Sequence, residues 1–240
     1  GHFGHIELAR PVFHVGFLKQ VKKILECICV ECGRLKVDKR DPLIQQIVKQ
    51  YSPKDRLKHI HEKAKSRMIC EPDEPKQEDG EENVQAPPPG HGGCGHIQPL
   101  IRREGLKVFV VYKKGKEDED DDSKSAAQPE KSLFSALQAH TLLSKIPDSD
   151  LKIMGLSLLY ARPSWMILTV LPVPPPPVRP SIAVDGTGMR SEDDLTYKLA
   201  EVLRVNQSVR RCEADGAPTH ILNEFEQLLQ FHIATYMDNE

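Results

Sequence analysis

Aromatic residues and long apolar segments are both scarce in this 240-residue chain. Aromatics make up 5% of the sequence, with a single tryptophan, and hydrophobic residues make up 39%. No apolar run reaches the roughly 18 residues that a membrane-spanning helix needs, which argues against an integral membrane protein. The chain also lacks a nucleophile elbow, a phosphate-binding loop and an H-E-x-x-H motif. These absences argue against a stand-alone hydrolase or transferase.

The two ends of the sequence lack the marks of a complete chain. It begins Gly1-His2-Phe3 without an initiator methionine, and no basic segment leads into an apolar run as in a signal peptide. It ends at Glu240, directly after a strongly periodic helical pattern. We therefore expect a fragment of a longer protein. Without a secretory signal, its six cysteines are expected to be thiols or metal ligands rather than disulfides.

Hydrophobic periodicity predicts a helix-dominated α+β fold with short strands. Apolar residues recur at helical spacing in 15–25, 42–48, 52–64, 133–146, 191–209 and 218–237. Continuous apolar or β-branched runs at 106–112 and 165–171 predict strands. Gly155 is expected to end a further short helix. The N-terminal half, which carries most of the cysteines, is expected to be irregular.

The same pattern assigns helix caps and inward-facing side chains. Proline follows an acidic or hydroxyl residue at 41–42 and 52–53, which is typical of helix starts, and Ser191 with Asp194 fits a capping box. The last two helices are expected to bury an apolar stripe as core. Their inward residues are Leu195, Leu199, Val202 and Leu203 on the first, and Ile221, Leu222, Phe225, Leu228, Leu229, Ile233 and Tyr236 on the second.

The formal net charge of −2 hides an uneven distribution. Residues 71–82 carry seven acidic side chains and one lysine, and residues 117–122 are all acidic. Such segments bury too little apolar surface to offset the entropy of ordering, so 71–89 and 116–128 are expected to be flexible loops. The other 222 residues carry a net charge of +10, so the body of the chain is basic.

The main candidate site is a set of cysteines. Cys29 and Cys32 form a C-x-x-C after a predicted helix, a spacing at which both thiolates can reach one metal ion. Cys70 and Cys94 can complete a four-sulfur zinc site, but the gaps are longer than in a compact zinc finger. The competing interpretation is a set of reduced, buried thiols, and spacing alone leaves both open.

The remaining cysteines and a redox role are less favoured. Cys27 is a rival ligand, but it lies nearer the apolar stripe of the helix and is assigned to packing. Cys212 lies far away in the sequence and is given no role. A thioredoxin-like function for Cys29 and Cys32 is weaker, since no βαβ pattern surrounds them.

His2 and His5 form a second candidate, because they lie among glycines in the first five residues. Two histidines cannot close a tetrahedral site, so further ligands would have to come from residues before Gly1. On the residues alone, a pair of exposed or hydrogen-bonded histidines is the favoured interpretation.

Several segments of the chain have distinctive sequences. These are GHFGHIELARPVFHVGF at 1–17, C-x-x-C at 29–32, GHGGCG at 90–95 with the following Gln98-Pro99 and Ile101-Arg102, RPSWMILTVLPVPPPPVRPSI at 162–182, EDDLTYKLAEVLRVN at 192–206 and LLQFHIATYMDNE at 228–240. Together they resemble the zinc-binding clamp of the largest subunit of multisubunit RNA polymerases, and most closely that of eukaryotic RNA polymerase II. The resemblance covers nearly the whole chain apart from the two acidic segments and 123–160.

The resemblance implies two zinc sites in the full subunit. Cys29, Cys32, Cys70 and Cys94 would bind one zinc ion. His2 would bind the other together with three cysteines that precede this fragment, so only the first site can be completed here. His5 belongs to the matching motif but does not occupy a ligand position of the family.

The resemblance also implies an activity, partners and a location. The enzyme is a DNA-directed RNA polymerase, a nucleotidyltransferase, whose catalytic magnesium is held by an aspartate triad that these residues lack. The expected partners are the other polymerase II subunits, including the second-largest, together with the DNA template and the RNA transcript, in the nucleus and away from membranes. The expected divisions are a zinc-binding clamp head at 1–105, strands and helices at 106–177, a lid-like loop at 178–194 and clamp core helices at 195–240.

The residue types in and before the lid-like loop favour an extended segment that ends in a turn. Consecutive prolines before it favour a stiff, extended polyproline rod, and Gly186 and Gly188 allow the chain to turn. Arg179 and Arg190 can contact phosphates, and Val184 offers an apolar contact near the tip. By resemblance, the loop helps to part the transcript from the template strand.

Two alternatives stay open on the sequence. The chain can be an autonomous zinc-containing module that docks a protein partner through its two C-terminal helices. It can also be the clamp of a related polymerase, that is polymerase I, polymerase III or an archaeal enzyme.

Overall fold

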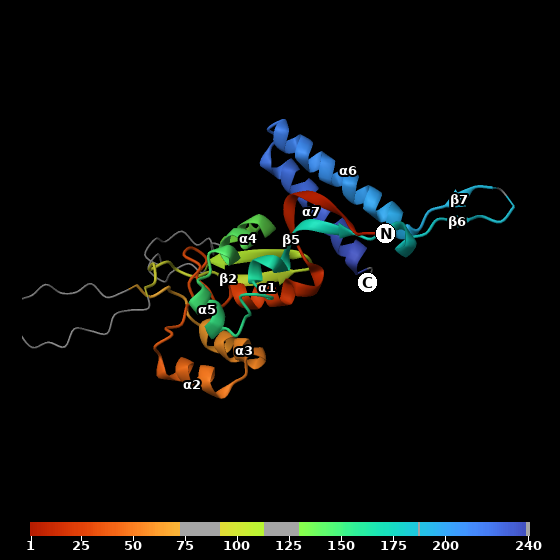
Figure 1. Ribbon diagram of the computed structural model, residues 1–240. Helices are drawn as coiled ribbons and strands as arrows, with labels where there is room; N and C mark the ends of the chain where they lie inside the picture. Colours follow the sequence, from red (N-terminus) through yellow and green to blue (C-terminus); the bar gives the residue numbers. More distant parts are fainter. Residues whose placement is uncertain (73–91, 113–129, 187, 239–240) are drawn as a thin grey trace, which may run out of the picture. The chain divides into compact units, whose positions relative to one another are not determined.

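The computed structural model describes residues 1–72, 92–112, 130–186 and 188–238, which form two compact units (Figure 1). Unit 1 comprises residues 1–18 and 166–240, and unit 2 comprises residues 19–165. Helices and strands are mixed in both, as the predicted α+β class requires. Apart from Glu71 and Pro72, the two segments predicted as flexible acidic loops lie outside the described residues.

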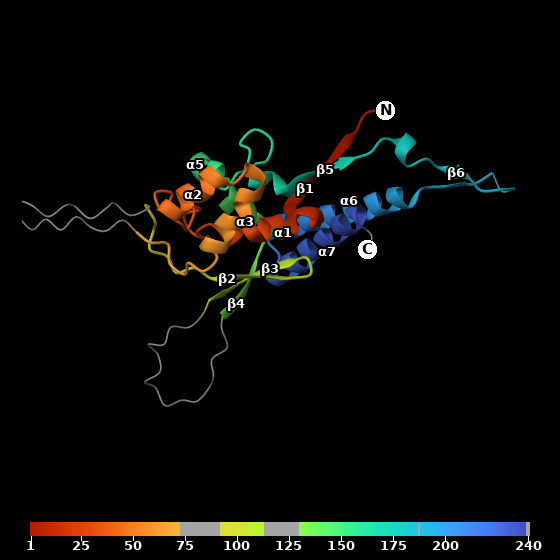
Figure 2. The same ribbon diagram turned by 90° about the horizontal axis from the view of Figure 1, so that it is seen from below.

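Unit 1 is built on a two-stranded antiparallel sheet and a pair of long helices (Figures 1 and 2). Strand β1 (Gly4–Phe13) pairs with β5 (Ile167–Val173), and helices α6 (Asp194–Ala214) and α7 (Thr219–Met237) lie side by side. The core of the unit joins the strands to the helices. It consists of Ile6, Val12, Leu171, Leu199, Val202, Val205, Val209, Leu229 and Ile233.

Two buried amide side chains complete the hydrogen bonding of β1. The register between β1 and β5 shifts between Glu7 and Val12, so the intervening backbone needs other partners. Asn206 of α6 accepts from Ala9 N at 2.7 Å and donates to Glu7 O at 2.9 Å. Gln230 of α7 accepts from the Phe13 amide at 2.6 Å and donates to its carbonyl at 2.9 Å. Asn206 therefore supplies partners where the ladder is interrupted, and Gln230 supplies them at the end of β1.

A narrow hairpin follows β5 in unit 1. The prolines do not form one continuous rod as predicted, because a 3₁₀ turn, η4 (Pro176–Val178), interrupts them. Two-residue strands, β6 (Ile182–Ala183) and β7 (Arg190–Ser191), then pair antiparallel. Gly186 and Gly188 have φ of 82° and 66°, as expected for glycines that allow a turn.

Unit 2 combines short helices with a three-stranded antiparallel sheet in the order β2-β3-β4. The strands are β2 (Leu100–Glu104), β3 (Lys107–Tyr112) and β4 (Glu130–Phe134). The helices are α1 (Leu18–Leu25), α2 (Pro42–Gln50), α3 (Pro53–Ala64), α4 (Ala136–Ser144) and α5 (Asp148–Ile153). The 3₁₀ turn η1 (Val15–Phe17) comes directly before α1 and belongs to unit 1, and η3 (Pro163–Met166) is the 3₁₀ turn at which the chain leaves unit 2. Gly155 follows α5 with φ of 79°, which confirms it as a helix stop.

Three local predictions about helix caps and strand or helix bounds were wrong. Asp193 rather than Ser191 caps α6, since its side chain accepts from Leu195 N at 2.9 Å. Trp165 lies in η3 and not in a strand, because β5 begins only at Ile167. Leu133 is in β4 rather than in a helix, because it pairs with Phe109 of β3.

The predicted buried stripe of the long helices also included residues that are exposed. Leu203 of α6 is 51% exposed and Leu228 of α7 is 41% exposed, so neither belongs to the core. The buried positions of α6 are spaced so that Leu203 falls beside the stripe and not on it. Within the part of the chain that the structure describes, no helix has both the length and the apolar character to cross a bilayer.

Candidate metal centre

The first pair of cysteines lies on a tight turn after α1. Cys29 N donates to Arg34 O at 2.8 Å, and Gly33 N donates to Cys29 O at 3.0 Å. Gly33 has φ of 74°, a conformation that favours glycine, and this lets the backbone turn back directly after Cys32. The flanking residues Ile28 and Leu35 form a β-bridge. The turn therefore presents the side chains of Cys29 and Cys32 together.

The second pair lies on two short segments that are far apart in sequence but paired in space. Cys70 N donates to His96 O at 3.0 Å, and Gly95 N donates to Cys70 O at 2.7 Å. A β-bridge joins Ile69 to Ile97 next to them. Because the two segments are hydrogen-bonded, the chain length between Cys70 and Cys94 does not keep their sulfurs apart.

The four sulfur atoms form one compact cluster within 4.8 Å of one another. The Sγ atoms of Cys29 and Cys94 are 3.6 Å apart, and those of Cys32 and Cys70 are 3.8 Å apart. A tetrahedral zinc site with Zn–S bonds of about 2.3 Å has sulfur–sulfur edges of about 3.8 Å. The donor set therefore fits a single four-coordinate metal ion.

Burial and hydrogen bonding act on these thiols in opposite directions. Burial raises the pKa of Cys70 and of Cys32. Burial also acts to raise the pKa of Cys29, but hydrogen bonds from the surrounding backbone and from the Cys94 and Gln98 side chains outweigh it and lower that pKa. Metal binding must therefore displace protons, Cys70 being the thiol most reluctant to ionise.

The other two cysteines lie apart from the cluster. Cys27 is fully buried, and its Sγ donates to Lys23 O at 3.2 Å. Burial raises its pKa to about 12, so it stays a neutral packing thiol. Cys212 lies on α6, in unit 1.

The two histidines near the N-terminus are exposed. His5 lies in β1 opposite Pro172, and His2 precedes that strand. Among the described ranges, no second group of three or more potential metal ligands is assembled. The zinc-binding role of His2 therefore stays a prediction.

The residues proposed for the lid-like loop occupy different parts of the hairpin. Arg179 lies at its base, where its Nε donates to Pro174 O at 3.0 Å and its Nη1 donates to Thr196 Oγ1 at 3.2 Å. Arg190 is exposed in β7, and Val184 is 48% exposed toward the turn. Arg190 and Val184 are thus exposed on the hairpin, whereas Arg179 fastens the hairpin to α6.

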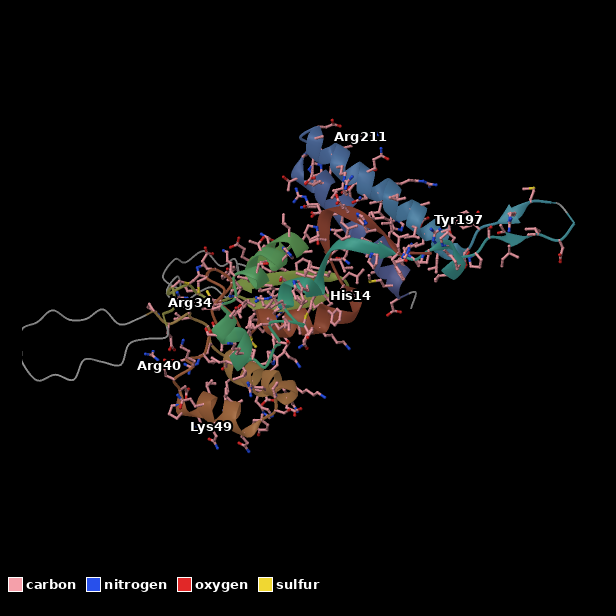
Figure 3. The ribbon with its side chains drawn as sticks, in the orientation of Figure 1. His14, Arg34, Arg40, Lys49, Tyr197 and Arg211 are labelled. Carbon is pink, nitrogen blue, oxygen red and sulfur yellow. The ribbon has the colours of Figure 1, made fainter. Side chains whose placement is uncertain are left out.

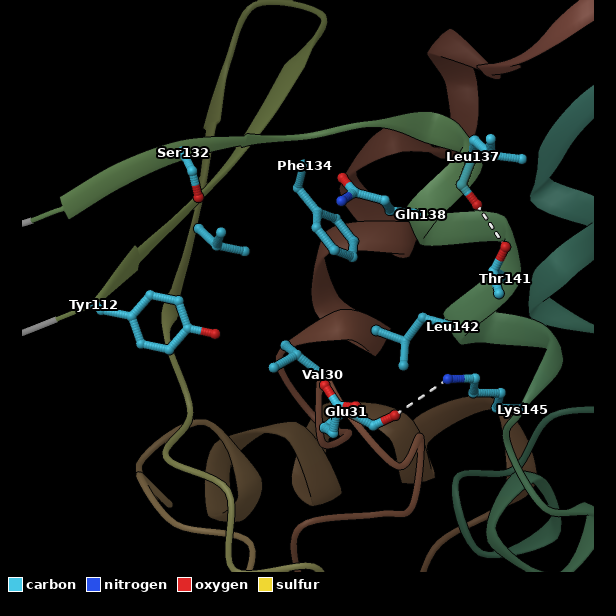
Figure 4. Close-up of a pocket in the computed structure, with 11 residues that line it drawn as sticks. Val30, Glu31, Tyr112, Ser132, Phe134, Leu137, Gln138, Thr141, Leu142 and Lys145 are labelled. Atoms are coloured by element: carbon cyan, nitrogen blue, oxygen red, sulfur yellow. Dashed lines mark hydrogen bonds between the residues drawn. The ribbon is translucent and has the colours of Figure 1, made fainter.

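An open pocket of about 520 Å³ lies beside the C-x-x-C turn (Figure 4). It is lined by residues of β3, β4 and α4, with Val30 and Glu31 of that turn at one side. Lys145 Nζ donates to Glu31 O at 3.4 Å and so ties α4 to that turn. Arg34, labelled in Figure 3, donates from Nη1 to Gly92 O and so ties the C-x-x-C turn to the segment that carries Cys94.

Sequence reasoning gave no role to two buried polar side chains next to the cluster. Gln98 is 2% exposed and Lys36 is 5% exposed. Burial of such residues without partners is costly, so their contacts carry information about the site.

Comparison with models of known families gives one match that spans the chain. The family is described as RNA polymerase Rpb1, domain 1, and the match covers residues 1–240. The cysteine cluster and the hairpin therefore both lie within the matched region. The chain belongs to the RNA polymerase Rpb1 domain 1 family and carries the N-terminal region of the largest subunit of a multisubunit DNA-directed RNA polymerase.

Proposed function

We propose that the chain forms the zinc-binding clamp and the lid of the largest subunit of RNA polymerase II, which hold the DNA–RNA hybrid during transcription in the nucleus. The observation that carries the proposal is a four-sulfur cluster of tetrahedral dimensions inside a polymerase-family match. Its role is structural, and the catalytic magnesium belongs to a part of the subunit outside this chain. The partners are the other subunits, including the second-largest, with the DNA template and the RNA transcript.

The ion proposed for the cluster is Zn²⁺. Thiolate sulfur is a soft ligand, and a four-cysteine tetrahedral set is typical of structural zinc. All four positions are supplied by the protein, so the centre has no open position for water or substrate. Such a site stabilises the turns that form it instead of catalysing a reaction.

Metal content tests this assignment directly. We expect the 240-residue chain, purified without chelator, to contain one zinc ion per molecule, as measured by elemental analysis and native mass spectrometry. Exposed Cys94 gives the chelator access to the ion, so prolonged dialysis against EDTA should remove it. Cys212→Ser is the matched control and should keep the metal. A chain that folds and contains no zinc would contradict the assignment.

The clamp role is supported by the charge of the chain. Outside the two acidic segments the net charge is +10, and basic side chains such as Arg40 and Lys49 lie on the outside of unit 2 (Figure 3). A basic surface attracts the phosphate backbone of nucleic acid regardless of sequence, and the attraction weakens with salt. The proposal therefore assigns this surface to nucleic acid and not to an acidic substrate.

The lid role is supported by the hairpin, whose apolar side chains are exposed. Ile182 is 69% exposed, Met189 is 70% exposed and Arg190 lies beside them in β7. In the assembled polymerase, replacing residues 182–191 by a short Gly-Ser link should lengthen the RNA–DNA hybrid, because no wedge separates the strands. Nuclease footprinting of stalled complexes measures the hybrid, and nucleotide addition on a short preformed hybrid serves as the control. An unchanged hybrid length would remove the lid assignment.

A stand-alone interaction module is the second candidate. It is favoured by apolar side chains exposed on the long helices, Leu203 on α6 and Phe231 on α7, at 51% and 50%. Such a module should be monodisperse when isolated, whereas a part of a large assembly should aggregate through apolar surface. The clamp of polymerase I, polymerase III or an archaeal polymerase is the related alternative within the same family.

A further inference from the structure

The Gln98 side chain joins the two cysteine-bearing parts of the metal centre. Its Oε1 accepts from Val30 N at 3.0 Å, within the C-x-x-C turn. Its Nε2 donates to Cys29 Sγ at 3.2 Å and to His96 O at 2.8 Å. The partners fix the amide orientation, since a backbone N–H can only donate and a carbonyl can only accept. A single buried side chain thus links the turn of Cys29 to the segment that carries Cys94.

The negative charge of a metal-bound thiolate cluster explains why a hydrogen bond from Gln98 to sulfur is stabilising. Four thiolates around a divalent ion leave a net charge of about −2 in a partly buried place, which N–H donors to sulfur must offset. Backbone donors to the sulfurs include Glu31 N to Cys29 Sγ and Cys94 N to Cys70 Sγ, both at 3.4 Å. Gln98 adds a side-chain donor at a shorter distance.

Lys36 supplies a cation to the same environment. It is 5% exposed, and its Nζ donates to Arg67 O at 3.2 Å. Burial lowers the pKa of Lys36, and the charges of Cys27, Glu26, Cys29 and Cys70 act in the opposite direction. A buried ammonium needs a counter-charge, which the Glu26 carboxylate and metal-bound thiolates would supply.

We propose that Gln98 is a positioning residue of the metal centre: it holds the two ligand-bearing segments in register and stabilises the Cys29 thiolate by an N–H···S bond. The inference rests on the proposed zinc function of the cluster. The proposal also predicts the order in which the ligands release the metal, because Cys29 is buried and held by Gln98 whereas Cys94 is exposed. The metal should therefore leave from the Cys94 side.

Zinc transfer from the full chain to the chelator 4-(2-pyridylazo)resorcinol tests the proposal. Gln98→Leu removes the donor, and Gln98→Glu replaces it by a carboxylate of the same shape. Both should release zinc about 10–100-fold faster than the unsubstituted chain. Gln46→Glu, the same change on the exposed face of α2, should leave the rate unchanged. Folded Gln98 variants that release zinc at the original rate would overturn the proposal.

A measurement on the unsubstituted chain keeps the test independent of variant folding. In the ¹¹³Cd-loaded, ¹⁵N-labelled chain, the Gln98 side-chain amide proton should show a scalar coupling to the metal through the hydrogen bond. The amides of Glu31 and Cys94 serve as internal references. Couplings at those two amides without one at Gln98 would refute the role of Gln98 while leaving the metal site intact. A chain that binds no metal would instead refute the proposed zinc function.

Discussion

Cys70→Ser should reduce the bound metal from one ion per chain to nearly none. Cys70 is fully buried, lies 3.8 Å from Cys32 Sγ, and accepts a hydrogen bond from Cys94 N. A serine hydroxyl is a hard, protonated group that zinc does not accept in place of a thiolate. Apparent binding free energies for structural zinc reach about 10–16 kcal/mol, so the stability that depends on the metal should be lost with it.

Native mass spectrometry and thermal unfolding with and without EDTA measure this effect. Unsubstituted protein should unfold at a lower temperature after chelation, whereas Cys70→Ser should unfold at that lower temperature in either condition. Cys27→Ala is the matched control, because Cys27 is equally buried but lies outside the cluster. The four-cysteine centre is ruled out if Cys70→Ser retains a full equivalent of zinc, or if Cys27→Ala loses it.

The metal centre was only partly predictable from the sequence. A C-x-x-C is a local signal, and Cys29 and Cys32 do lie on one tight turn. The choice of Cys70 and Cys94 over Cys27 needed information that spacing does not hold. It depends on the pairing of Ile69 with Ile97, which brings together segments separated by a long gap. Non-local pairing of this kind is decided by tertiary structure.

The burial of Gln98 and Lys36 could not be predicted from the sequence either. Polar residues are usually exposed, so a sequence gives no reason to place either inside. Both are buried because the folded chain supplies partners: Cys29 Sγ, Val30 N and His96 O for the Gln98 amide, and Arg67 O for the Lys36 ammonium. Their role near the cysteines therefore depends on the tertiary arrangement of the four sulfur atoms, which the sequence does not show.

Helices were predicted better than strands for a related reason. The periods of α6 and α7 depend on their own residues. α7 begins and ends close to the predicted positions, whereas α6 begins at Asp194 and continues to Ala214, past the predicted end at Val209. No strand was predicted at β1 or β4. β1 contains Pro11 and an interrupted ladder, and β4 (EKSLF) is mostly polar and exposed. Such strands are specified by their partners, which are β5 and β3.

The packing of α7 gives the second large effect, in the other unit. Leu229 is fully buried in the core of unit 1, in one cluster with Val202 of α6 and Leu171 of β5. Leu229→Ala removes buried methyl groups and leaves a cavity, so we expect it to lower the free energy of unfolding by about 2–5 kcal/mol. Denaturant titration followed by circular dichroism measures the change, provided that the slope of the transition is unchanged.

The neighbouring residue makes a matched control for that prediction. Leu228 is 41% exposed, so Leu228→Ala alters the same helix with the same chemistry but opens no cavity. Its cost should stay below about 1 kcal/mol, because little buried apolar surface is lost. Since helix propensity changes equally in the two variants, their difference isolates the contribution of the core. Equal costs would mean that the helix face assigned to the core of unit 1 is wrong and that Leu228 belongs to that face.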